Sequence, residues 1–251
     1  MNKYINNIIL IVVVILVIVL FNTSCTSINK FVSDLHVGRG KWLNSNRLLQ
    51  QSLSQYDKAI VINPKSSNAY TQRALLYENI GQYDKAIDDC NNMLYLNPHN
   101  PTALGIRASV YIYLKQYDKA IEDSTLVVQY APDWATGYYT RGLAFSEINE
   151  YVKAISDVSK AIVLEPTMVM AFNTRGICYA SLNESSKAVL DFSNAIKIAP
   201  NYDEPYFNRG KVYMTLMMKQ EAIDDFTKYI SLSNNSIQII IARQFIDNIN
   251  K

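Results

Sequence analysis

Cysteine, histidine and glycine are scarce in this chain of 251 residues, which contains three Cys, two His and eight Gly. Three cysteines cannot build a disulfide framework, and two histidines leave few ligands for a metal cage. Eight glycines and seven prolines exclude collagen-like and linker-rich chains. His36 and His99 lie far apart in the sequence, so we expect neither a metal site nor another cofactor.

The chain also lacks an excess of charge of one sign. It carries 24 Lys and Arg against 22 Asp and Glu, a net charge of +2. Nucleic-acid-binding proteins usually gather a basic excess on one face, so we expect no nucleic-acid partner. Apolar residues make up 49% of the sequence, which is enough for a packed core and excludes wholesale disorder.

Motifs of catalysis are missing as well. The sequence contains no GxSxG, HExxH, GxxxxGK[ST], GxGxxG or CxxC. The acidic pairs at 88–89, 122–123 and 224–225 are adjacent on predicted helices and point in different directions, unlike the facing carboxylates of glycosidases. We therefore expect that this protein is not an enzyme. The alternative, an active site on an uncommon surface, has no residue pattern in the sequence that supports it.

One long apolar run stands near the start of the chain. Ile8–Phe21 is unbroken, follows Lys3 and would extend about 21 Å as a helix. A bilayer requires about 20 apolar residues, so 14 are typical of the apolar region of a signal peptide.

The residues after this run resemble a bacterial lipoprotein signal, in which a new N-terminal Cys is lipidated. Thr23 and Ser24 precede Cys25, and the departure is Asn22, where that signal prefers an aliphatic residue. The resemblance implies a signal segment at 1–24, lipidation at Cys25, a short tether at 25–32, and an exported protein held on a membrane, facing the periplasm or the cell surface. An uncleaved signal anchor in the inner membrane and simple secretion remain alternatives. Cys90 and Cys178 fall on apolar helix faces, where we expect small hydrophobes.

Prolines mark an internal repeat. Successive prolines lie 34 residues apart, at Pro64, Pro98, Pro132, Pro166 and Pro200. Each repeat is counted from 31 residues before its proline. From the repeat of Pro98 on, position 4 is aromatic or Leu, position 8 is Ala or Gly, position 11 is aromatic and position 20 is Ala. In the repeat that starts at residue 67 these are Tyr70, Ala74, Tyr77 and Ala86. Positions 4, 8 and 11 share one helix face, and Pro at position 32 stops a second helix.

The period and the pattern resemble the tetratricopeptide repeat family. The resemblance implies an all-α superhelical solenoid with a concave inner surface, because a single helix pair cannot bury its apolar face and must stack on its neighbours. We expect a divergent first repeat at 33–66, five further repeats at 67–100, 101–134, 135–168, 169–202 and 203–236, and a capping helix at 237–251.

Opposite charges recur within the pattern. Every repeat has Arg at position 7, and five have Asp at position 23, both on or beside packed faces. A lone charge there would be costly, so we predict ion pairs that fix helix register, within one repeat or between neighbours. An Arg ladder that binds a ligand is the alternative. The predicted ladder comprises Arg73, Arg107, Arg141, Arg175 and Arg209 with Asp89, Asp123, Asp157, Asp191 and Asp225.

The resemblance also implies which residues face the inner groove. The two-carboxylate clamp of chaperone-binding members of the family is absent. Amide and hydroxyl side chains dominate the groove positions, and they can hydrogen-bond the backbone of an extended peptide. We expect a partner-binding groove formed by Gln72, Asn79, Tyr113, Tyr139, Thr140, Asn173, Thr174, Phe207, Asn208 and Lys211.

These observations predict a membrane-tethered scaffold that binds a peptide segment or helix of another envelope protein. The alternative is a self-associating structural module, a homo-oligomer with no peptide ligand. The sequence does not identify the partner.

Overall fold

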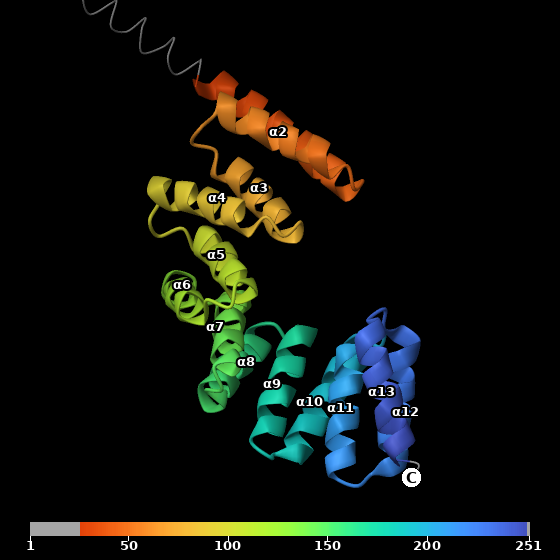
Figure 1. Cartoon of the computed structure of the whole chain (residues 1–251). Helices are drawn as coiled ribbons and strands as arrows, with labels where there is room; N and C mark the ends of the chain where they lie inside the picture. Colours follow the sequence, from red (N-terminus) through yellow and green to blue (C-terminus); the bar gives the residue numbers. More distant parts are fainter. Residues whose placement is uncertain (1–25, 250–251) are drawn as a thin grey trace, which may run out of the picture. The chain divides into compact units, whose positions relative to one another are not determined.

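The computed structural model describes residues 26–249, and every regular element in that range is a helix. The chain divides into two compact units, residues 1–106 and 107–251, with one helix across the division (Figure 1). The predicted signal segment 1–24 and Cys25 lie outside the described residues. Within the described range, no helix combines the length and hydrophobicity needed to cross a membrane.

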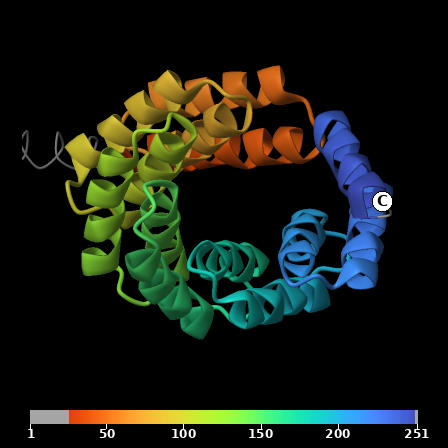
Figure 2. The ribbon, with the colours of Figure 1, turned by 60° about the horizontal axis from the view of Figure 1, so that its bottom comes forward.

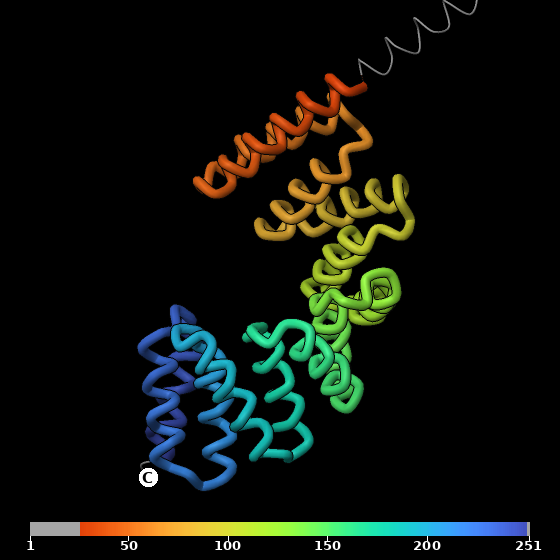
Figure 3. The backbone as a smooth tube through the Cα atoms, turned by 180° about the vertical axis from the view of Figure 1, so that it is seen from behind, coloured from red at the N-terminus to blue at the C-terminus, as the bar shows by residue number. Residues whose placement is uncertain are grey.

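The first unit contains helical hairpins. Residues 26–45 are helical and run antiparallel beside α2 (Figure 3). Residues 26–32, which fall within the predicted tether at 25–32, belong to this first helix, and no Gly or Pro interrupts them. The helices that follow are α2 (Leu49–Ile62), α3 (Ser67–Asn79), α4 (Tyr83–Leu96) and α5 (Pro101–Tyr113), which crosses into the second unit.

The second unit stacks helix pairs in two layers. The first helices of successive pairs, α7, α9 and α11, contact one another, and each second helix packs against the first helices on either side of it (Figure 2). The bounds are α6 (Tyr117–Tyr130), α7 (Ala135–Glu147), α8 (Tyr151–Leu164), α9 (Val169–Ser181), α10 (Ser185–Ile198), α11 (Glu204–Thr215), α12 (Lys219–Leu232) and α13 (Ser236–Ile249).

Small residues at position 8 let the two helices of a pair approach closely. A Cβ added to Gly176 would lie 2.7 Å from the ring of Phe192, and one added to Gly142 would lie 2.6 Å from Cγ2 of Val158. The large partner at position 24 thus fills the space that the missing side chain of the glycine leaves, and the same pairing recurs between Gly210 and Phe226.

Each pair is joined by the same turn. The residue at position 15 has a positive φ in all six repeats, and the next residue's N–H bonds back to the carbonyl five residues earlier, as from Gln82 to Tyr77 at 2.8 Å. This is a Schellman motif, which satisfies the last carbonyls of the first helix. Glycine occurs there once, and the six residues are Arg47, Gly81, Lys115, Asn149, Asn183 and Met217.

The C-terminal helix α13 covers the last pair, as a capping helix should. Ala242 is fully buried against the aromatic cluster of α11 and α12. The ring of Phe245 lies 5.3 Å from that of Phe226 and 6.2 Å from that of Phe207, measured between centroids. The predicted cap at 237–251 therefore corresponds to a helix that begins one residue earlier, at Ser236.

Candidate partner-binding site

The structure brings each predicted Arg and Asp of the ladder together within one repeat. Each arginine donates from Nε to Oδ2 and from Nη2 to Oδ1 of its aspartate, as Arg107 does to Asp123 at 2.7 Å and 2.8 Å. The five pairs span 2.6 to 2.9 Å, and all five aspartates are buried. Such bidentate bonds fix both distance and orientation, so the ladder sets the register of the two helices.

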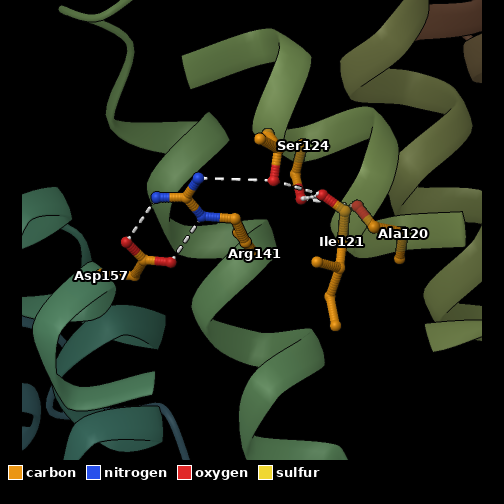
Figure 4. Close-up of polar contacts among 6 residues, drawn as sticks. Ala120, Ile121, Ser124, Arg141 and Asp157 are labelled. Carbon is orange, nitrogen blue, oxygen red and sulfur yellow. Dashed lines mark hydrogen bonds and ion pairs between the residues drawn. The ribbon is translucent and has the colours of Figure 1, made fainter. Parts of the chain in front are cut away.

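The ladder also joins one repeat to the next. The remaining nitrogen, Nη1, of Arg175 donates to Oγ of Ser159 at 2.9 Å, and that of Arg209 donates to Oγ of Ser193 at 2.8 Å. Arg141 donates to both carboxylate oxygens of Asp157 (Figure 4) and reaches Oγ1 of Thr125 at 3.4 Å in the same way. These hydroxyls stand at position 25 of the preceding repeat, so one guanidinium connects three helices. In the first unit, Arg73 makes the equivalent contact with Asp57 at 2.6 Å.

Aromatic rings complete the environment of the arginines. The guanidinium carbon of Arg175 lies 5.8 Å from the ring centroid of Phe172 and 5.9 Å from that of Tyr179, at positions 4 and 11. The hydrogen bond to Asp191 raises the pKa of Arg175 above its ordinary value, so the side chain stays charged. With its donors directed at Asp191 and Ser159, this arginine serves the packing of the repeats, and the alternative of a ligand-binding Arg ladder loses its support.

The first repeat lacks the aspartate at position 23. Position 23 is Gln55, and its side-chain oxygen lies 2.8 Å from Nδ1 of His36. Ser52 at position 20 donates to the carbonyl oxygen of Gly40 at 2.8 Å, which ties the two helices together. The divergent first unit thus keeps the helix pair with different polar contacts.

Tyr113, an exposed predicted groove residue, ends α5, and the other predicted groove residues of the second unit lie on the layer formed by α7, α9 and α11. There a chain of hydrogen bonds links Asn208 to Asn173 at 3.1 Å, Asn173 to Glu204 at 3.3 Å, and Tyr202 to the same carboxylate oxygen at 2.5 Å. Burial and the Glu204 carboxylate raise the pKa of Tyr202, so its phenol remains a donor. The network fixes the amide of Asn208 with Nδ2 turned to Asn173.

Several predicted groove residues are packed inside the protein. Thr140, Asn173 and Thr174 are at most 6% exposed, and the Tyr139 hydroxyl bonds to Thr174. Phe207 lies in the aromatic cluster beneath α13, with its ring centroid 5.0 Å from that of Tyr229. Thr140, Asn173 and Thr174 therefore offer little surface to a partner, whereas Tyr139 and Phe207 are partly exposed. Gln72 and Asn79 lie on α3 in the first unit.

A hollow of about 460 Å³ opens between α9 and α11. Its volume falls in the range of about 300–1,000 Å³ typical of small-ligand sites. Asn208 and Lys211, both predicted from the sequence, lie on its wall. Its apolar lining combines Ile177 and Phe192, from α9 and α10, with Val212 from α11 of the next pair, and sequence reasoning missed Phe192 and Val212.

Comparisons with known proteins agree with this architecture. Models described as tetratricopeptide repeats match residues 55–88, 101–133 and 203–236. No curated protein sequence matches the chain.

Similar solved structures include tetratricopeptide repeat proteins. A tetratricopeptide repeat protein from Parabacteroides merdae ATCC 43184 is 21% identical, with a TM-score of 0.68 over 87% of this chain and 84% of that one. MamA is 26% identical, with a TM-score of 0.56 over 64% of this chain and 95% of that one. YrrB, described as a TPR protein with an unusual peptide-binding site, is 18% identical, with a TM-score of 0.57 over 75% of this chain and 97% of that one. The matched repeats, the paired helices and the shared fold together identify this chain as a tetratricopeptide repeat protein.

Proposed function

We propose that this protein is a membrane-tethered scaffold that binds an extended segment of a partner protein in the hollow between α9 and α11. Repeats of this family form scaffolds for protein–protein interaction, and YrrB is one described as binding a peptide. The tether is the segment at 1–24 with Cys25, proposed from its resemblance to a lipoprotein signal.

The observation that carries the proposal is the mixed chemistry of the hollow. Ile177 is 37% exposed, which makes an accessible apolar contact, and Val212 and Phe192 lie behind it. Because Asn208 donates to Asn173, its Oδ1 can accept from a peptide N–H. Lys211 adds one positive charge. The hollow therefore suits an apolar side chain with a backbone amide beside it and an acidic group near Lys211.

A pull-down from solubilised membranes tests this function. The bait is the full chain, compared with an Ile177→Ser, Lys211→Glu variant, and we expect the variant to lose the partner, since an accessible apolar anchor contributes about 1 kcal/mol or more and reversal of a charge adds to that. The matched control is Leu190→Ser, Lys187→Glu, at exposed positions of α10 that do not line the hollow.

Equal recovery of every partner by the bait and the hollow variant would contradict the proposal. The self-associating alternative predicts a different result. The mass measured by light scattering would then rise with protein concentration in the bait and in both variants, and no other protein would be captured.

A further inference from the structure

The first helix carries an exposed apolar stripe. Ile28, Phe31, Leu35 and Trp42 are each between 58% and 64% exposed. At about 100° per residue, these four fall within an arc of about 60°, so they form one line along the helix. Four large apolar side chains in one line are more than the single exposed hydrophobes that any protein surface carries.

The opposite face of the same helix is the one that packs on α2. Val37 is 2% exposed and belongs to a cluster with Leu53 and Tyr56. Ser33 donates to the carbonyl oxygen of Ala59 at 3.0 Å, and Figure 3 shows the two helices side by side. The hairpin is therefore held together without the stripe, and the stripe faces away from α2.

Basic residues flank the stripe. At about 100° per residue, Arg39 lies about 20° from one edge of the stripe, and Lys41 and Lys30 lie about 80° and 100° from the other edge. The single acid within residues 26–45, Asp34, lies on the side of the two lysines. An apolar line with cations beside it is the arrangement of helices that lie in the interface of a bilayer with anionic lipids. The long side chains of Lys and Arg can reach the headgroups while the apolar line enters the acyl region.

The sequence places this helix close to the proposed membrane anchor. Seven residues separate Phe21, the end of the apolar run, from Ile28. Even a fully extended chain spans at most about 25 Å over that length. Cys25, the proposed lipidation site, is three residues from Ile28. Either form of anchor would keep the start of the stripe near the bilayer surface.

We propose that the helix at 26–45 lies along the surface of an anionic bilayer, with Ile28, Phe31, Leu35 and Trp42 inserted and Lys30 and Lys41 at the lipid phosphates. The inference rests on the membrane tether of the proposed function and adds an orientation to it. The hairpin of this helix and α2 is then held flat against the membrane by a second contact, in keeping with the rule that stable attachment requires two signals.

The two tryptophans of the chain allow a direct test. Trp42 lies in the stripe and Trp134 in the second unit. Two variants of the full chain are bound to vesicles of phosphatidylcholine and phosphatidylglycerol. In Trp134→Phe the fluorescence comes from Trp42, and in Trp42→Phe it comes from Trp134. We expect Trp42 to shift its emission to the blue, to be quenched by lipids brominated on the acyl chain, and to lose roughly twofold or more of its quenching by iodide, as an inserted indole does. Trp134 should show none of these changes.

A charge within the stripe tests the contact itself. Leu35→Glu, made in the Trp134→Phe chain, should strongly reduce bromolipid quenching of Trp42 while the anchor keeps the protein on the vesicles. Val61→Glu on α2, where Val61 is 80% exposed and outside the stripe, is the matched control and should leave the quenching unchanged.

Three results would overturn the proposal, and they differ from one another. A vesicle-bound chain in which iodide quenches Trp42 as well as Trp134 retains its tether but lacks the surface contact. If the blue shift of Trp42 emission grows with protein concentration while brominated lipids do not quench Trp42, the stripe contacts a second copy of the chain. A full chain that does not associate with vesicles refutes the tether, and the orientation fails with it.

Discussion

The Arg175–Asp191 pair offers a quantitative test of the ladder. Asp191→Ala removes both acceptors of a bidentate pair in which the aspartate side chain is 3% exposed and the arginine side chain 19%. The guanidinium would keep only its bond to Ser159. Removing one partner of a buried ion pair typically costs about 3–5 kcal/mol, because the other charge is left uncompensated. We expect a loss of that size in the free energy of unfolding.

The double variant separates pairing from burial. In Arg175→Met, Asp191→Leu both charges are absent, and replacement of a buried ion pair by apolar residues is often neutral or stabilising. We therefore expect the double variant to be more stable than Asp191→Ala, with a coupling energy of about 2 kcal/mol or more in the cycle. Lys187→Ala is the control, since its pair with Glu184 on α10 is exposed and should contribute less than about 1 kcal/mol.

Urea unfolding followed by circular dichroism gives the stabilities, and hydrogen exchange of α9 and α10 locates the effect. Exchange is needed because stacked repeats do not always unfold in one step. If Asp191→Ala stayed within about 0.5 kcal/mol of the parent, or the double variant were no better than the single one, the ladder would not set helix register as argued.

Other predictions follow from the packing, and each is checked by the same unfolding measurement unless stated. Gly142→Ala should destabilise the protein by about 1–3 kcal/mol, because its Cβ would lie 2.6 Å from Val158, whereas Gly38→Ala, with open space around it, should stabilise by about 0.5–1 kcal/mol; equal effects would contradict the close approach. Met217→Gly should stabilise by about 0.5–1 kcal/mol by relieving a φ of 57° at an exposed turn, and no gain would mean that the strain is absent. Phe245→Ala should cost about 1–3 kcal/mol and increase binding of a hydrophobic dye, because it uncovers Phe207 and Phe226; unchanged dye binding would refute its capping role. In a Cys25→Ser chain, no thiol should react with Ellman's reagent until urea is added, because Cys90 and Cys178 are fully buried and burial raises the pKa of the Cys178 thiol; rapid labelling of the native chain would contradict this.

The repeats could be predicted from the sequence because their constraints recur at fixed positions. Glycine at position 8 meets a bulky residue at position 24, as Gly176 meets Phe192, and a charge at position 7 requires a partner nearby. The pairing of Arg175 with Asp191 follows from that requirement. The bond to Ser159 does not, because position 25 holds Asp, Thr or Ser in different repeats and so gives no periodic signal.

Other features depend on neighbours that the pattern does not specify. Position 15 has a positive φ in every repeat. Gly81, Asn149 and Asn183 are residue types that tolerate a positive φ, but Lys115 and Met217 are not, so the residue types at this position do not predict the turn. Phe207 has a groove position in the repeat, yet α13, which lies outside the repeat pattern, covers it. The first helix includes residues 26–32, which precede the first repeat, so the repeat pattern could not predict that they are helical.

The Arg–Asp ladder and the hollow share the helix α11. Arg209 on α11 donates to Ser193 on α10 and to Asp225 on α12, and the hollow lies between α11 and the α9–α10 pair. The distance from α11 to α10 is thus set by a buried charge-assisted contact and not by the occupant of the hollow. A site whose walls are fixed in advance loses little entropy when it binds, so a short peptide with few contacts can still be held. This explains why a polar network and an ion-pair ladder, neither of which needs to touch the partner, surround the place where we expect it to bind.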